Sequence, residues 1–440
     1  MNTKNVKTTM MLTAVLAMMS VSLNAQTTWN IGTPTATALT ATLSGGTLTI
    51  NGTGAMQDFP SYDAVPWYSV RNSITSLVIN SGVTSIGNYA FRDCGNITSA
   101  LNLPNTITVI GDYAFYNCLK LPGTLNIPNV ITIGSNAFYN CLKLTGALTL
   151  PATLTSLGND AFYSCSGLNG TLTIPNSITA IPDDAFMSCS GLTGGLTIPN
   201  TVTSIGSSAF MGCKSLTGTL TIPDLVTSIG PTAFSGCRGL TGALTIPNAV
   251  KTIGFATFNN CVGLTSLIAG NSVTVIEYNA FSNCTGLTSV TVPSTIVKIG
   301  DYCFSACTGL QTFTCLNVDT VKTMGTSIFS GVTVSACTLK VPAGSEAKYS
   351  KALQWKDFGS IVGISTAIES VQAANPLRAW VENGVLHVSG LTAGETWNVY
   401  NAAGICTFTN IAGADLQSVP IQSHGIYIVK QRNNAVKIVW

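Results

Sequence analysis

Cysteine is the residue type in this chain whose number and spacing first suggest chemistry. The 440 residues include 14 cysteines, ten of which recur at steps of 23 or 24 residues. So many cysteines invite a disulfide framework or a metal site. The ten recurring residues are Cys94, Cys118, Cys141, Cys165, Cys189, Cys213, Cys237, Cys261, Cys284 and Cys307.

The regular spacing argues against pairing of these ten thiols. Stacked turns of chain lie about 4.8 Å apart with parallel side chains, whereas a disulfide needs Cβ atoms about 3.8 Å apart that turn toward each other. We therefore predict a ladder of small buried apolar residues. Cys303, Cys315 and Cys337 are irregularly spaced, so the pattern leaves open one local disulfide there.

Other residue types give little support for a catalytic or metal site. The two histidines, His387 and His424, lie near the carboxyl end, and no C-x-x-C, H-E-x-x-H, G-x-S-x-G or phosphate-binding glycine motif occurs. Asp160, Asp183 and Asp184 fall in turns, where capping explains them, although a glycosidase pair could be assembled across turns. We predict no enzyme, no cofactor and no metal.

The elements that position these residues come from an internal repeat. A phenylalanine recurs at steps of 23 to 25 residues, which is the period of a solenoid. One repeat cannot bury its apolar face alone, so neighbouring turns must stack. The recurring residues are Phe91, Phe115, Phe138, Phe162, Phe186, Phe210, Phe234, Phe258, Phe281, Phe304 and Phe329.

Each segment of the repeat has a physical role. The alternation Leu172-Thr173-Ile174 predicts a short strand with two inward apolar side chains, and Pro175 ends it because proline donates no ladder hydrogen bond. Ile178 and Ile181 return to the core. We expect the stretch Asp184-Ala185-Phe186 to cross the other side as a helical or 3₁₀ turn.

The unit I-P-x-x-V-T-x-I-G-x-x-A-F-x-x-C-x-x-L resembles the leucine-rich repeat of the BspA-like surface protein family, and it covers well over half of the chain. The resemblance implies a right-handed solenoid in an exported bacterial protein, and some family members are adhesins. Two flanking segments are similar to the family's lead-in and helix-bearing end cap: Gly46 to Met56 with Pro66-Trp67, and Val341 to Ser345 with Tyr349, Trp355 and Phe358.

The amino terminus predicts export. Lys4 and Lys7 precede an apolar run from Met10 to Val21, and Asn24-Ala25 provides a small-residue exit. This run is shorter than the roughly 20 residues that a membrane span requires. We therefore expect a cleaved signal peptide, no membrane span in the mature chain, and a location at the cell surface or outside the cell.

The carboxyl end predicts a separate β domain. Runs such as Val385-Leu386-His387-Val388 and Trp397-Asn398-Val399-Tyr400 alternate, with turn residues between them. The start at Asn375-Pro376 and the run from Gly425 to Lys430 resemble the sorting or anchoring domains of exported bacterial proteins. A plain accessory sandwich is the alternative.

The predicted fold class is an α/β repeat that is rich in β structure: a leucine-rich-repeat solenoid followed by a small all-β sandwich. We expect six segments along the chain: a signal peptide (1–25), an amino-terminal β cap (26–75), repeats (76–342), a carboxy-terminal helical cap (343–364), a linker (365–374) and the sandwich (375–440).

The exposed strand positions are the predicted binding surface. About eleven strands at about 5 Å each would form a row some 50 Å long, large enough for a protein or a glycan. A net charge of +2 without a basic cluster argues against nucleic acid. We predict adhesion or capture of an extracellular protein, with glycan binding and a self-associating surface layer as alternatives. The row consists of Asn102, Asn126, Thr149, Thr173, Thr197, Thr221, Thr245 and Thr291.

Overall fold

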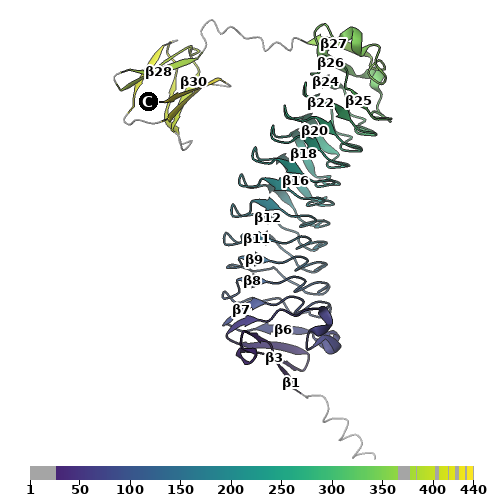
Figure 1. Cartoon of the computed structure of the whole chain (residues 1–440), viewed down its shortest axis with the longest axis vertical. Coiled ribbons are helices and arrows are strands. Elements are labelled where there is room, and N and C mark those ends of the chain that lie inside the picture. The colour runs from purple at the N-terminus through teal and green to yellow at the C-terminus, as the bar shows by residue number, and fades with distance from the viewer. Residues whose placement is uncertain are drawn as a thin grey trace, which may run out of the picture. The chain divides into compact units, whose positions relative to one another are not determined.

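The computed structural model describes residues 26–364, 377–382, 384–401, 406–414, 416–421, 426–431 and 434–439. The chain divides into two compact units, and the boundary along the sequence falls between Gly363 and Ile364. The predicted signal peptide and linker lie outside the described residues. The fold class expected from the sequence is confirmed, since a β-rich solenoid is followed by a small region of antiparallel sheets (Figure 1).

In the first unit each turn contributes to two rows of parallel strands (Figure 1). One row, here called the long-strand row, carries the Leu-Thr-Ile segments. Its apolar residues point inward and its threonines outward, because side chains alternate along a strand. Its strands are β10 (Leu148–Thr149), β12 (Leu172–Thr173), β14 (Gly194–Thr197), β16 (Leu216–Thr221), β18 (Leu240–Thr245), β20 (Gly263–Ile268), β22 (Ser289–Val292), β24 (Thr312–Cys315) and β26 (Thr338–Pro342).

The short-strand row lies across the core and buries the isoleucine of each Ile-Gly pair, as Ile205 and Ile229 illustrate. Its members pair in parallel within three sheets, β7-β8-β9-β11, β13-β15-β17 and β19-β21-β23-β25. They are β7 (Val83–Ile86), β8 (Val109–Ile110), β9 (Thr132–Ile133), β11 (Ser156–Leu157), β13 (Ala180–Ile181), β15 (Ser204–Ile205), β17 (Ser228–Ile229), β19 (Thr252–Ile253), β21 (Val275–Ile276), β23 (Lys298–Ile299) and β25 (Thr323–Met324).

The third side of each turn is here called the turn edge. It does not form the helical or 3₁₀ turn that the sequence predicted. Around Phe186 the chain makes β-turns, because Asp184 and Ser188 have left-handed φ values of 54° and 60°. These residues aim backbone N–H groups at the next turn: Asp184 donates to the Ser207 carbonyl and Phe186 donates to the Ala209 carbonyl. Hydrogen bonds between repeats therefore alternate with turn bonds inside the repeat, such as that from the Met187 N–H to the Asp184 carbonyl, and every backbone group named here has a partner.

The core of the solenoid is a continuous stack of aromatic rings. Neighbouring phenylalanines lie nearly parallel, with centroids 5.2 Å apart for Phe115 and Phe138 and 5.4 Å apart for Phe210 and Phe234. The predicted burial of the cysteine ladder is confirmed, and all 14 cysteines are unpaired. Each thiol from Cys118 to Cys307 in the ladder also donates to a phenylalanine carbonyl, as Cys189 does to Phe162 at 3.0 Å.

Tryptophans end the aromatic stack on both sides. Trp67 stacks on Phe91 at 5.9 Å and donates its indole N–H to the Ala90 carbonyl. Trp355 packs at 6.0 Å from Phe329.

Both ends of the solenoid carry further elements. The amino-terminal elements are β1 (Thr27–Asn30), β2 (Gly32–Thr33), β3 (Leu39–Ser44), β4 (Thr47–Gly52), β5 (Gly54–Met56) and β6 (Ser76–Ile79), with 3₁₀ turns at Ala36–Ala38, Tyr62–Ala64 and Tyr68–Ser73. The carboxy-terminal elements are a 3₁₀ turn (Val334–Ala336), α2 (Glu346–Tyr349) and β27 (Ser360–Ile364).

The second unit has a core of its own, built from residues such as Leu386, Trp397 and Val429. Two antiparallel sheets contribute to it, in the orders β28-β29-β32 and β31-β30-β33-β34. This shared core between two sheets is a small sandwich. The strands are β28 (Arg378–Glu382), β29 (Val385–Ser389), β30 (Thr396–Asn401), β31 (Cys406–Ile411), β32 (Gln417–Pro420), β33 (Ile426–Gln431) and β34 (Asn434–Val439).

Candidate functional site

All eight residues predicted for the binding surface lie on the outer face of the long-strand row or on the turns that extend it. Thr291 is half-buried and the other seven are exposed. Parallel pairing aligns Asn102 with Asn126, Thr149 with Thr173 and Thr197 with Thr221. The structure thus brings them into one column, here called the outer column.

The outer column includes residues that the predicted row did not name. Ile268 pairs with both Thr245 and Thr291, and Thr314 pairs with both Thr291 and Lys340. Ile268 is 48% exposed, so the column carries one apolar side chain among its hydroxyls. The sequence already contained the evidence for this exposed isoleucine, because Leu267-Ile268-Ala269 occupies the positions that Leu244-Thr245-Ile246 holds one repeat earlier.

Two shallow depressions lie on this face. One of about 480 Å³ is lined by Thr124, Asn126, Ala147, Thr149 and Pro151, among others. The other, of about 210 Å³, is lined by the corresponding Thr219, Thr221, Ala243, Thr245 and Pro247, with Asp224 beside them. Hydroxyl and amide groups with small apolar surfaces between them can hydrogen-bond a neutral polar ligand.

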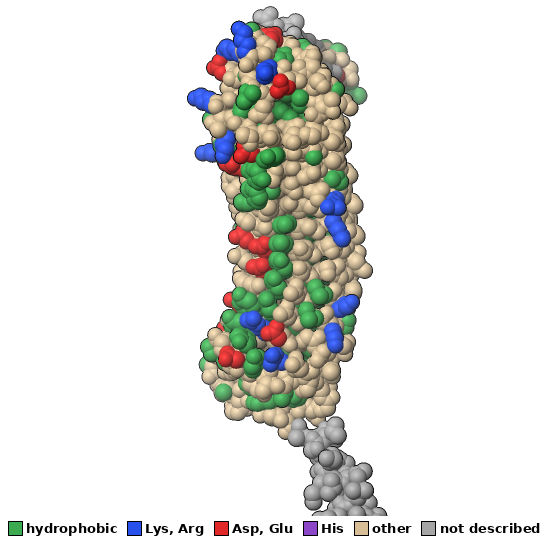
Figure 2. Space-filling view, turned by 90° about the vertical axis from the view of Figure 1, so that its right-hand side faces the viewer, with side chains coloured by type: hydrophobic (Ala, Val, Ile, Leu, Met, Phe, Trp, Pro, Cys, Tyr) green, Lys and Arg blue, Asp and Glu red, His purple; other side chains and the backbone are tan. Residues whose placement is uncertain are grey.

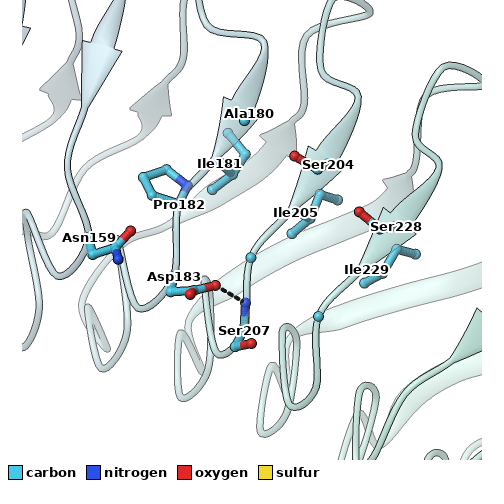
Figure 3. Close-up of a pocket in the computed structure, with 12 residues that line it drawn as sticks. Asn159, Ala180, Ile181, Pro182, Asp183, Ser204, Ile205, Ser207, Ser228 and Ile229 are labelled. Carbon is cyan, nitrogen blue, oxygen red and sulfur yellow. Dashed lines mark hydrogen bonds between the residues drawn. The ribbon is translucent and has the colours of Figure 1, made fainter.

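A third depression, of about 400 Å³, lies beside the short-strand row near Pro182 and Asp183 (Figure 3). The Asp183 carboxylate accepts the backbone N–H of Ser207 in the next repeat at 2.6 Å, so it links two stacked turns, whereas the sequence suggested a cap of its own turn. Burial, and then the neighbouring Asp184 and Asp183 carboxylates, raise the pKa of Asp160. The Asp183 carboxylate therefore holds its own turn to that of the next repeat.

The turn edge carries a second candidate surface, a row of stacked tyrosines. Successive ring centroids lie 4.3 to 5.6 Å apart. Burial, and then the adjacent Tyr163, raise the pKa of Tyr139 to about 12, so the hydroxyl remains protonated at neutral pH. We call this row the tyrosine ladder; it consists of Tyr89, Tyr113, Tyr116, Tyr139 and Tyr163, all half-buried.

An arginine binds the amino-terminal end of the tyrosine ladder. The Arg92 guanidinium lies 4.7 Å from the ring centres of both Tyr62 and Tyr116, and 5.3 Å from that of Tyr113. Its Nε lies 3.4 Å from the Asp93 carboxylate. Cation–π contacts of this kind hold a guanidinium in a fixed position. Figure 2 shows the turn edge, where hydrophobic side chains form a band with a few charged groups beside it.

The repeat pattern alone did not reveal the partners of the tyrosine ladder. Tyr62 comes from the amino-terminal cap, outside the repeat. Arg92 occupies the position after the phenylalanine, where Tyr116, Tyr139 and Tyr163 stand in later repeats. The arginine at a position that later repeats fill with tyrosine was the sign of this contact that the sequence offered.

Comparison with known proteins identifies the repeat. The family profile described as the BspA-type leucine-rich repeat region matches residues 67–193, 122–241 and 240–347. The chain belongs to the BspA-type leucine-rich-repeat family. A search of curated proteins found no significant match.

Three solved structures similar to this BspA-type chain are bacterial. A leucine-rich-repeat protein from Bacteroides ovatus is 22% identical, with 74% of this chain and 98% of that chain covered and a TM-score of 0.46. One from Eubacterium ventriosum is 24% identical, with 70% and 95% covered and a TM-score of 0.44. A leucine-rich cell surface protein from Faecalibacterium prausnitzii is 23% identical, with 75% and 94% covered and a TM-score of 0.45.

No helix in the described parts of this BspA-type chain is long and apolar enough to cross a membrane. Within those same parts, no group of three or more His, Cys, Asp or Glu side chains is placed to hold a metal ion.

Proposed function

We propose that this protein is exported by a bacterium and binds an extracellular protein through its solenoid, in adhesion or ligand capture. Membership of the BspA-type family supports a binding role at a cell surface. The observation that carries the proposal is the tyrosine ladder with Arg92 at its end. Tyrosine and arginine are, with tryptophan, the residue types enriched among the energetic centres of protein interfaces.

The arrangement of the tyrosine ladder also favours tight binding. Each ring is held by its stacked neighbour on the adjacent repeat, as Tyr139 is by Tyr163 at 4.3 Å. Arg92 is likewise fixed, with its side chain only 24% exposed. Because these side chains are ordered before a partner arrives, binding costs less conformational entropy than it would for free side chains.

The test is a binding screen of the full chain against an array of extracellular-matrix proteins and glycans. For a protein that binds, we expect Tyr116→Ala or Tyr139→Ala to weaken the affinity at least tenfold, or about 1.4 kcal/mol. The matched controls are Thr173→Arg and Thr221→Arg on the outer column, which are expected to leave that affinity unchanged.

Two outcomes would redirect the proposal. If only the arginine variants lose the partner, the outer column is the protein-binding surface and the tyrosine ladder is structural. If no array protein binds while the chain associates with itself, a surface-layer role replaces adhesion.

A further inference from the structure

Positive charge collects on one edge of the solenoid. Between Asp93 and Val250 the sequence contains four Lys or Arg residues, and each follows a ladder cysteine by one or two positions. At least 23 residues separate them along the chain, so only the stacked turns bring them together. We call these four exposed residues the basic row: Lys120, Lys143, Lys214 and Arg238.

Lys120 and Lys143 form the first pair of the row, on adjacent turns. An asparagine stands three residues before each lysine, and the Asn140 side-chain N–H donates to the Asn117 side-chain oxygen at 3.0 Å. The two turns are therefore aligned at this place. Adjacent turns lie about 4.8 Å apart, so the two lysines are close neighbours of like charge.

Lys214 and Arg238 form the second pair. A Cβ atom added to Gly239, the residue after Arg238, would lie 3.1 Å from the Lys214 carbonyl oxygen, so these two turns are in contact at the same place. Three turns, or about 14 Å, separate this pair from the first. The positions between the pairs are small and uncharged: Ser166, Gly167, Ser190 and Gly191.

Neutral amides orient both ends of the basic row. Lys120 donates to the Asn96 side-chain oxygen at 2.9 Å. At the other end the Asn260 amide oxygen, turned toward the guanidinium, accepts from the Arg238 Nε at 3.1 Å and from Nη2 at 2.9 Å. Within the described residues none of the four cations forms an ion pair. The row thus holds oriented cations whose charge is not compensated.

The acidic residues of the same stretch lie elsewhere on each turn. Over the middle turns in Figure 2, basic side chains lie to the right of the hydrophobic band and acidic ones to its left. Like charges at neighbouring positions destabilise a stack, and an external anion would remove this repulsion. Four of the five aspartates between Asp93 and Val250 stand two or three positions before a phenylalanine: Asp112, Asp160, Asp183 and Asp184.

The geometry of the basic row argues against nucleic acid. Duplex DNA carries a charge about every 1.7 Å along its axis, which the uncharged gap of about 14 Å would leave unmatched. Single strands bind by stacking their bases on aromatic faces. The nearby tyrosine faces are already covered, because Tyr116 stacks on Tyr139 and Tyr139 on Tyr163.

A sulfated polysaccharide has the features that the basic row requires. The row is a single file about 24 Å long over five turns, which suits a linear polymer. Paired cations match anions that come in clusters, as sulfate groups on neighbouring positions of a sugar do. A polymer with a single carboxylate in each repeat offers only isolated anions.

We propose that the basic row binds a linear sulfated polysaccharide, with one sulfate cluster at Lys120 and Lys143 and a second at Lys214 and Arg238. The small residues between the pairs let the sugar backbone approach the surface. Leu119 and Leu142, 42% and 36% exposed, stand next to the first pair in sequence and offer apolar contacts to the sugar rings. The site does not include the tyrosine ladder and does not depend on protein binding there.

The test is calorimetric titration of the full chain with a heparin decasaccharide. The comparison ligands are a hyaluronan decasaccharide, which carries carboxylates without sulfate, and an oligodeoxythymidylate. The row variant combines Lys120→Gln, Lys143→Gln, Lys214→Gln and Arg238→Gln. Its matched control combines Lys251→Gln, Lys322→Gln, Lys340→Gln and Lys351→Gln, and so loses the same charge from exposed lysines outside the row. Thermal melting verifies that both variants fold.

We expect heparin to bind the native chain at least tenfold more tightly than either comparison ligand. The row variant is expected to weaken heparin binding at least tenfold and the control to leave it within a factor of two. The proposal is overturned if heparin does not bind, if hyaluronan or the oligonucleotide binds equally well, or if both quadruple variants behave alike. Tyr116→Ala is expected to retain heparin binding, so this result and that of the protein screen are independent.

Discussion

At the scale of single residues, the cysteine ladder combines burial of each thiol with a hydrogen bond to the neighbouring repeat. Each ladder cysteine is buried as a small apolar residue, and from Cys118 onward each also donates to a backbone carbonyl one repeat away. Burial raises the pKa of Cys165 to about 12, so almost no thiolate forms at neutral pH. Since thiolate is the reactive form, these residues are chemically protected.

This protection predicts the pattern of thiol labelling. Native protein treated with iodoacetamide at pH 8 is expected to react at Cys406, the one exposed cysteine, while the 13 buried cysteines remain unmodified. Denaturation without reductant should then expose all 13 to the reagent. Mass spectrometry of the intact chain counts the modified residues. A count well below 13 in the second step would reveal disulfides that contradict the ladder.

At the scale of the element, the turn edge is defined by two left-handed residues per repeat. One stands two places before the phenylalanine and the other two places after it, as Asp160 and Ser164 do around Phe162. Asparagine, aspartate and glycine tolerate this conformation best, and they recur at these places, for example as Asn140 and Gly212. The stacked turns therefore depend on backbone preference as well as on burial.

Substitution at Ser188, where φ is 60°, tests this dependence. Ser188→Val is expected to lower the free energy of unfolding by about 1 to 2 kcal/mol, because a β-branched residue is strained in the left-handed region. Ser188→Gly should be neutral or slightly stabilising, since Gly212 and Gly236 hold the equivalent position natively. Urea denaturation followed by circular dichroism measures both variants. Equal stability of the two would show that φ strain is not what shapes this edge.

At the scale of the whole molecule, the two units have separate cores. The solenoid core runs from Ile31 to Phe358, and the second unit has its own cluster around Trp397 and Val399. A sandwich with an independent core can serve a task apart from the solenoid. We propose, from its resemblance to sorting domains, that it directs or anchors the protein at the cell surface.

Deletion of Asn375 to Trp440 tests that role. We expect the shortened protein to be lost from the cell surface, either released to the medium or retained inside the cell, because the solenoid keeps its own core. Immunoblots of surface, medium and cell fractions from the source organism measure the distribution. As a control, Trp397→Ala removes a buried side chain of the tail core and should give the same phenotype. Unchanged surface display of the deletion variant would refute the sorting role.

The period of the sequence by itself determined which residues face inward. Phe162, Cys165 and Leu172 repeat with the turns, and stacking requires that such residues be buried. For the same reason the exposed position of Thr173 and its equivalents followed from strand alternation alone. The second β unit was also predicted, from alternating runs such as Val385 to Val388.

The tertiary structure alone decided how separate segments meet. Whether Asp184 to Phe186 forms a helix or stacked turns depends on competition between hydrogen bonds within a repeat and bonds to the next one, and local sequence does not reveal that outcome. The cluster of Tyr62 with Arg92 joins the cap to a repeat, so no period relates them. Repetition specifies which side of the chain is buried, whereas contacts across the stack and at its ends arise only when the turns are assembled.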